Sequence, residues 1–296
     1  MIGLPESGDQ IDILEQKSRR FESPCGEGTL VIRGWPGPSE SAGSVLLMHG
    51  GSGSWTHWYR NIEYLTRQFN VYAIDLPGLG DSEALALGYS AEDAVNVVGS
   101  GIKLLPNVEQ FHIVAFSWGC AVSSQLVKIL KDKILSLMLV GPASIGDIPR
   151  RGLIEPLLKR HAGMSEDEIF FANRENLAQL MIHQRNRIDD LAVYIQAENT
   201  IRSRFNSPQF AQSTLVLDGV EGMTAPLKVV YGEHDAPAQP DIESKKALFE
   251  AVKPDVNFEI VLDAGHWLQY ERSRIFNRMC EEWLCKNEQQ AGGAKI

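Results

Sequence analysis

Short, nearly continuous runs of apolar residues recur along this chain and predict buried β-strands. A turn-forming cluster follows each run, and a helical pattern comes after it. The runs lie at residues 45–48, 71–74, 111–116, 134–140, 227–231 and 258–262. Because both faces of such strands are apolar, they are typical of a parallel sheet covered by helices on both sides.

Helical periodicity fills the intervals between the apolar runs. The predicted helices lie at residues 57–68, 90–105, 118–130, 242–252 and 271–285. An alternation of strands and helices places the chain in the α/β class. Residues 29–35 and residues 18–23 are expected to add antiparallel strands at one edge. The result is a mostly parallel sheet of about eight strands.

Residues 142–222 interrupt this alternation. The stretch carries no strand signal and is helical and charged, and a structureless loop of that length is implausible in a compact domain. We therefore predict a helical cap domain at 142–222, inserted into a core formed by 1–141 and 223–296. The polar tail at 287–296 is expected to fray.

Composition and charge narrow the choice of partners. Hydrophobic residues make up 44% of the chain, and 38 acidic against 28 basic residues give a net charge of −10. No basic stripe is interleaved with aromatic residues, so we expect no nucleic-acid partner. The first ten residues lack the apolar core of a secretory signal, and no run reaches the roughly 18 apolar residues of a membrane helix. We expect a soluble, cytoplasmic protein, which leaves room for a homo-oligomer.

The segment A-F-S-W-G, from Ala115 to Gly119, has the features of a nucleophile elbow. It joins the predicted strand 111–116 to the predicted helix 118–130. So tight a turn pushes Ser117 toward positive φ and requires small residues two positions before and after it. The turn presents the serine hydroxyl at a helix N-terminus, where backbone N–H groups stabilise negative charge. A serine that caps an ordinary helix is the alternative at this point.

A serine hydroxyl becomes a strong nucleophile only when a base takes its proton, and the base must be held in one tautomer. On this type of fold the expected chain order is serine, acid, histidine. Asp235 follows the run at 227–231, and His266 follows the run at 258–262. The carboxyl ends of parallel strands share one edge of the sheet. We therefore predict Ser117 as nucleophile, His266 as general base and Asp235 as the acid that orients it.

Other carboxylates compete with Asp235 for the role of the acid. Glu233 lies in the same turn, and Asp147 follows the strand that precedes the insertion. Asp263 lies three residues before His266 and can cap the turn instead. The spacing within G-E-H-D favours Asp235, because it leaves the side chain room to turn back toward the histidine.

The glycine-rich loop H-G-G-S-G at residues 49–53 predicts an oxyanion hole. It follows the apolar run at 45–48, and its glycines let a backbone N–H face the developing negative charge. We predict the backbone N–H groups of Gly51 and Trp118 as the two donors. A phosphate-binding loop is the alternative, but neither G-x-G-x-x-G nor G-x-x-x-x-G-K is present.

Taken together, the motifs resemble those of the α/β-hydrolase superfamily. They occur in family order: H-G-G-S-G at His49, D-L-P-G-L-G-D-S at Asp75, F-S-W-G at Phe116, G-E-H-D at Gly232 and G-H-W-L-Q-Y-E at Gly265. The resemblance covers residues 45–271, most of the chain. It implies an α/β-hydrolase fold with a core of about eight strands and a helical cap.

The G-H-W-L-Q-Y-E motif and the F-N-R that follows it also resemble hydrolases that split carbon–carbon bonds of ring-fission dienones. Those enzymes have an asparagine before the serine, where this chain has Phe116. They also carry an arginine in the cap, for which Arg187 and Arg202 are the nearest candidates. Ser117 excludes the dehalogenase and epoxide hydrolase relatives, whose nucleophile is an aspartate.

Aromatic residues near these motifs predict an apolar pocket for an acyl or aryl group. We assign substrate binding to Gly50, Phe116 and Trp267. The predicted function is hydrolysis of a small to medium carboxylic ester through an acyl-enzyme on Ser117, with no metal or organic cofactor. The alternatives are carbon–carbon hydrolysis of a ring-fission (meta-cleavage) product, acyl transfer to another acceptor, and ligand binding on a hydrolase scaffold.

Overall fold

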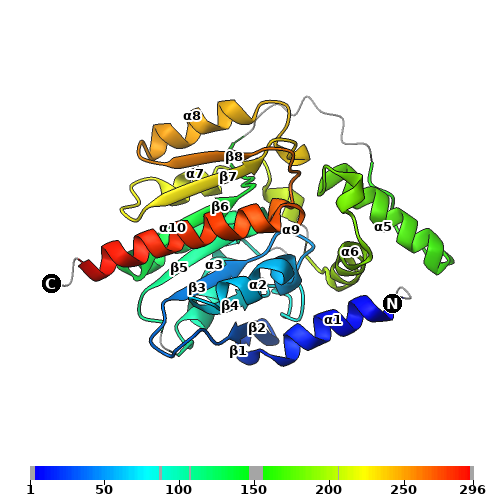
Figure 1. The fold of residues 1–296 in the computed structure, drawn as a ribbon, viewed down its shortest axis with the longest axis horizontal. Coiled ribbons are helices and arrows are strands. Elements are labelled where there is room, and N and C mark those ends of the chain that lie inside the picture. Colours follow the sequence, from blue (N-terminus) through cyan, green and yellow to red (C-terminus); the bar gives the residue numbers. More distant parts are fainter. Residues whose placement is uncertain (1–3, 87–88, 107, 147–155, 206, 294–296) are drawn as a thin grey trace.

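The computed structural model describes residues 4–86, 89–106, 108–146, 156–205 and 207–293. An eight-stranded sheet runs through it in the order β1-β2-β4-β3-β5-β6-β7-β8 (Figure 1). The strands are β1 (Arg19–Cys25), β2 (Gly28–Trp35), β3 (Ser44–Met48), β4 (Asn70–Ile74), β5 (Phe111–Phe116), β6 (Ile134–Val140), β7 (Leu227–Gly232) and β8 (Asn257–Val261). Strand β2 pairs antiparallel with β1 and β4, and all other pairs are parallel. The predicted fold class and mostly parallel sheet are confirmed.

Helices cover both faces of the sheet, as the apolar runs predict. The helices are α1 (Pro5–Gln16), α2 (Tyr59–Leu65), α3 (Ala91–Ile102), α4 (Trp118–Leu130), α5 (Glu166–Leu180), α6 (Asp190–Arg202), α7 (Leu215–Val220), α8 (Ile242–Val252), α9 (Leu268–Glu271) and α10 (Ser273–Gly293). Apolar residues of α2 and α10 belong to one core cluster, and those of α3, α4 and α8 belong to the other.

The strands supply alternate residues to these two clusters. In β3, Val45 and Leu47 belong to the first cluster, while Leu46 and Met48 belong to the second. All four side chains are fully buried. Side chains alternate between the two faces of a strand, and both faces are covered here, so the strand is apolar at every position.

Between β6 and β7 the chain leaves the sheet. The described residues of this stretch, 141–146, 156–205 and 207–226, form α5, α6, α7, short 3₁₀ turns and loops, with no strand among them. Helix α6 contacts the N-terminal helix α1, which the sequence analysis did not predict (Figure 1). The contact is close, because a Cβ atom at Gly8 would lie 3.2 Å from the Tyr194 hydroxyl.

The C-terminal tail differs from the sequence-based expectation. Helix α10 continues to Gly293, so the prediction of fraying from residue 287 is wrong for residues 287–293. Asn287 is buried, and its side-chain amide donates to the Trp283 carbonyl at 2.7 Å. This contact supports the helix beyond the point where the composition turns polar. None of the helices in the described part of the chain is long and apolar enough to cross a membrane.

Candidate active site

Ser117 occupies the turn between β5 and α4, where its backbone has φ +51° and ψ −113°. Positive φ in a residue with a side chain is strained, and such strain clusters at functional sites. Gly119 makes the turn possible, because a Cβ there would lie 2.7 Å from the carbonyl oxygens of Met48 and His49. The sequence-based requirement for a small residue at this position therefore has a direct structural cause.

Asp235 and His266 form a buried pair at the ends of β7 and β8. The His266 Nδ1 atom lies 2.9 Å from both carboxylate oxygens of Asp235. Asp235 is completely buried, and His266 is 4% exposed. Because the carboxylate can only accept, Nδ1 carries a proton, and Nε2 is the ring nitrogen left to act as a base.

The competing carboxylates are engaged elsewhere. Glu233 accepts a hydrogen bond from the Asp263 backbone N–H at 3.0 Å, and the Asp263 side chain pairs with Arg272 at 3.1 Å. Both carboxylates are exposed. Asp147 lies outside the described residues. Within the described chain, Asp235 is the carboxylate that contacts the His266 ring.

Gly141 at the end of β6 lies directly against this pair, and the sequence analysis missed it. A Cβ atom at Gly141 would lie 2.9 Å from the Asp235 Oδ2 atom and 2.9 Å from the His266 Nδ1 and Cε1 atoms. Its φ is +54°, which also favours glycine. The sequence did offer one signal for Gly141. It directly follows a predicted strand, at the same edge of the sheet as Ser117, Asp235 and His266.

His49 fixes the glycine-rich loop beside Ser117. Its Nδ1 donates to the Gly50 carbonyl at 2.7 Å, and its Nε2 accepts from the Leu76 N–H at 2.9 Å. Complete burial lowers the pKa of His49 to about 4, so the ring stays neutral in the one tautomer that makes both bonds. A Cβ at Gly50 would lie 3.1 Å from the Ser117 Cβ, so the loop closely approaches the serine.

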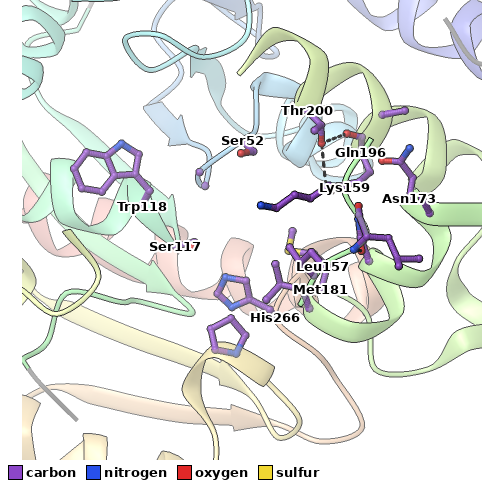
Figure 2. Close-up of a pocket in the computed structure, with 18 of the residues that line it drawn as sticks. Ser52, Ser117, Trp118, Leu157, Lys159, Asn173, Met181, Gln196, Thr200 and His266 are labelled. Carbon is purple, nitrogen blue, oxygen red and sulfur yellow. Dashed lines mark hydrogen bonds between the residues drawn. The ribbon is translucent and has the colours of Figure 1, made fainter. Parts of the chain in front are cut away.

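A cavity of about 780 Å³ opens above Ser117 (Figure 2). The predicted site residues that line it are Gly50, Gly51, Phe116, Ser117, Trp118 and His266. Asp235 lies behind His266. The structure thus brings together all of the predicted catalytic and oxyanion-hole residues.

Trp267 is the predicted substrate-binding residue that the structure does not place in the cavity wall. Its indole N–H donates to the His57 carbonyl at 2.9 Å, and its ring stacks on Tyr270 with centroids 4.2 Å apart. The side chain is fully buried. In this position Trp267 supports the loop that carries His266 and does not face a ligand.

The two arginines considered for the cap also lie away from the cavity. Arg187 is exposed on a 3₁₀ turn, and Arg202 pairs with Asp81 at 2.8 Å. The side chains that α5, α6 and the preceding loop present to the cavity include Lys159, Arg160, Asn173, Gln196 and Thr200. Sequence reasoning missed this set, because the chain offers no motif around it.

Glu271 joins the histidine loop to the segment between β6 and β7. Its buried carboxylate accepts from the Gly265 N–H at 2.7 Å, the Gln184 N–H at 2.7 Å and the His183 N–H at 3.2 Å. The backbone N–H of Trp267 also donates a hydrogen bond to the Met181 carbonyl at 2.7 Å. The backbone beside His266 is therefore tied to residues 181–184.

One surface group among the described residues has the composition of a metal site. Glu233, His234 and Asp263 hold potential ligand atoms within 4.8 Å of one another. All three are exposed and none of them lines the cavity. Exposed acidic groups of this kind are common without an ion.

Comparison with known proteins identifies the family. The sequence profile of the alpha/beta hydrolase family matches residues 45–278, which is most of the chain. The chain belongs to the alpha/beta hydrolase family. The match begins with β3 and ends within α10, so it includes the strands and loops that hold Ser117, Asp235 and His266.

Relatives within this family carry several different names. A 2-hydroxy-6-oxononadienedioate/2-hydroxy-6-oxononatrienedioate hydrolase of Pseudomonas putida is 24% identical over 93% of this chain and 99% of its own length. The dihydrolipoyllysine-residue acetyltransferase component of the acetoin cleaving system of Cupriavidus necator is 26% identical over 82% of this chain, which spans only 64% of that relative. The crystal structure of a carboxylesterase of Bacillus subtilis superposes with a TM-score of 0.70 at 18% identity, covering 95% of this chain and 96% of that one. The last similarity concerns the fold alone.

Proposed function

We propose that this hydrolase-family protein cleaves a small to medium carboxylic ester through a catalytic triad of Ser117, His266 and Asp235. One observation carries the proposal. The strained Ser117 lines the same 780 Å³ cavity as His266, whose ring is held from behind by the buried Asp235. A nucleophile, a base with a defined tautomer and space for a substrate are the requirements of acyl transfer.

The proposed reaction has two halves. His266 Nε2 takes the Ser117 proton as Oγ attacks the ester carbonyl, and the backbone N–H groups of Gly51 and Trp118 stabilise the oxyanion. His266 then donates the proton to the departing alcohol, which leaves an acyl ester on Ser117. Water, deprotonated by His266, attacks this ester and releases the acid, and the proton returns to the serine.

We further propose that residues 142–222 act as a cap over a core formed by residues 1–141 and 223–296. The support is that α5 and α6 contribute Asn173 and Gln196 to the wall of the cavity that Ser117 lines from the core. The substrate would then be a small molecule enclosed between the two parts. The cytoplasmic location and a homo-oligomeric state remain predictions from the sequence.

Carbon–carbon hydrolysis is the second candidate, because several relatives are named as hydrolases of 2-hydroxy-6-oxo-dienoates. Such a reaction must stabilise a dienolate before cleavage, which calls for a cation or strong donor at the cavity. Acyl transfer is a third, supported by the name of the Cupriavidus necator relative. All three reactions can use the same proposed nucleophile, Ser117, so only a comparison of substrates distinguishes them.

The test is a panel of 4-nitrophenyl esters of increasing acyl length beside a coloured ring-fission dienone, with each reaction followed by absorbance. We expect ester turnover and no dienone turnover. A fluorescent phosphonate should label the protein at Ser117. Faster turnover of the dienone than of every ester would reverse the proposal in favour of carbon–carbon hydrolysis.

A further inference from the structure

The charge of the cavity wall differs from that of the protein as a whole. The chain has ten more acidic than basic residues, yet no Asp or Glu is among the described residues that line the cavity. Apart from His266, the ionisable side chains in its wall are Lys159 and Arg160. An acidic protein thus presents a cationic wall beside its proposed nucleophile, which favours an anionic ligand.

The side chain of Lys159 reaches into this space. Figure 2 shows its side chain extended into the cavity, with the ammonium nitrogen toward Ser52 and Ser117. Its ammonium group has no ion pair or hydrogen bond with any other described residue. Apolar side chains such as Leu157, Ile169 and Met181 line the same cavity. Lys159 is exposed, so water solvates its ammonium group until an anion binds, and the resulting pair gains strength as the bound ligand displaces water from the apolar walls.

The backbone that carries Lys159 is held in place from α5. The Leu158 N–H donates to the Asn176 Oδ1 atom at 2.8 Å, and the Asn176 side-chain amide donates to the Leu158 carbonyl at 2.9 Å. These two bonds hold the peptide groups on either side of Leu158, so they fix the direction of the backbone as well as its position. Since Lys159 is the next residue, this anchor directs its side chain toward the cavity.

Arg187 and Arg202 cannot take this role in the observed arrangement. Arg202 already pairs with Asp81 at 2.8 Å and lies 3.7 Å from Glu198. Arg187 is exposed and does not line the cavity. Recognition of an anion at Ser117 therefore falls to the loop before α5.

We propose that the preferred substrate is an ester that also carries a carboxylate on an apolar chain, and that Lys159 binds this carboxylate while the ester carbonyl lies at Ser117. The inference rests on the proposed ester hydrolysis and names its substrate class. Lys159 acts as a specificity-determining residue: it contacts the part of the substrate that does not react. The apolar wall accepts the chain between the two groups.

The test compares half-esters of dicarboxylic acids with neutral isosteres. The probes are mono-4-nitrophenyl adipate, pimelate and suberate, each beside the analogue in which a primary amide replaces the free carboxylate. We expect kcat/KM for at least one chain length to exceed that of its amide partner by about tenfold, the usual contribution of a charged hydrogen bond. Lys159→Gln should reduce this ratio to near one, and Lys159→Arg should keep most of it.

Lys246→Gln is the matched control, because it removes the same charge from an exposed site on α8 that pairs with Glu250. It should retain the parent ratio, which excludes an effect of net charge alone. A ratio near one at all three chain lengths in the parent, or an unchanged ratio in Lys159→Gln, would overturn the inference while ester hydrolysis stands.

Calorimetry separates this inference from the proposed reaction. In the Ser117→Ala background, the intact pimelate half-ester should bind about tenfold more tightly than its amide partner, and adding Lys159→Gln should remove the difference. This result without ester turnover in the parent would refute the reaction and retain the anion site. Equal binding of the two probes would refute the anion site.

Discussion

The loops at the carboxyl edge of the sheet and the helices between β6 and β7 build the two sides of one cavity in different ways. At the sheet edge, side chains are buried and contacts are close: added atoms at Gly119 or Gly141 would lie within 3 Å of their neighbours. Across the cavity, Lys159 and Arg160 project from an exposed loop. The first side has no room to vary, whereas the second can change residue by residue without disturbing the sheet.

In the proposed function, this difference places the chemistry on one side of the cavity and substrate selection on the other. Proton transfer and nucleophilic attack need atoms fixed to a fraction of an ångström, which the packed sheet edge provides. Substrate choice requires only complementary charge and shape. Substitutions at the sheet edge should therefore reduce turnover of every substrate, and those on the opposite wall should change which substrate is preferred.

The largest effect is expected for Ser117→Ala. Without the hydroxyl no acyl-enzyme can form, and turnover of all esters should fall on the order of 10⁴-fold or more. The fluorescent phosphonate should label the parent and not the variant. Retained activity, or labelling at another residue, would remove Ser117 from its proposed role.

The second-largest loss of turnover is expected for Asp235→Asn. An amide cannot hold the Nδ1 proton of His266 as the carboxylate does, so the basic nitrogen is lost from the Ser117 side and turnover should fall by about 10³-fold or more. Circular dichroism and the melting temperature should stay close to those of the parent. Full turnover in this variant would transfer the role to another carboxylate, and Asp147→Asn would then be the decisive variant.

Gly141→Ala tests how closely the edge is packed. The new methyl group would overlap Asp235 and His266 and would strain a backbone at φ +54°. Displacement of the pair by a few tenths of an ångström to about 1 Å should cost roughly tenfold to a hundredfold in turnover. Gly163→Ala is a matched control, since its φ of +92° is also positive but no atom lies within 4 Å of an added Cβ. Equal turnover in the two variants would contradict a positioning role for Gly141.

Glu271→Gln tests the connection between the two sides. The amide keeps the shape but loses the charge that three backbone N–H groups share, so the free energy of unfolding should fall by about 1–3 kcal/mol in urea titrations. We expect a smaller loss of turnover than in Gly141→Ala, because the Asp235–His266 contact itself is intact. Glu282→Gln, on the exposed surface of α10, should leave stability unchanged. Equal stability of the two variants would show that the Glu271 bonds contribute nothing.

Arg187→Ala and Arg202→Ala should have the smallest effects. Arg202 is 51% exposed in its pair with Asp81, and exposed pairs contribute under about 1 kcal/mol. Neither side chain lines the cavity, so ester turnover should change by less than about twofold in both variants. If either variant lost dienone turnover and kept ester turnover, carbon–carbon hydrolysis would be established, and the substituted arginine would belong to the active site.

The positions that the sequence predicted well are those that a local backbone motif determines. Ser117 and Asp235 each follow a buried strand within a glycine-containing turn, so a few neighbouring residues are enough to place them at the sheet edge. The apolar runs that predict the strands are local features of the sequence as well. For these reasons β6 and α4 have the predicted bounds.

The residues that the sequence analysis misplaced or did not consider depend on contacts between residues distant in sequence. Trp267 lies in a recognisable motif, but its ring direction is set by the His57 carbonyl, 210 residues away. Lys159 is directed by Asn176 on the following helix, and no periodicity marks the loop that carries it. Side-chain direction of this kind follows from tertiary packing, which local patterns do not encode.

The contact between α1 and α6 has a practical consequence for work with the purified protein. Gly8 lies against Tyr194 on the helix that also supplies Gln196 to the cavity wall. A purification tag or fusion partner at the N-terminal end would sit beside that helix, whereas the C-terminal end of α10 lies on the opposite side of the molecule (Figure 1). Substrate profiles measured with an N-terminal fusion would therefore include the influence of the fusion, and a C-terminal tag is the better choice for comparing variants.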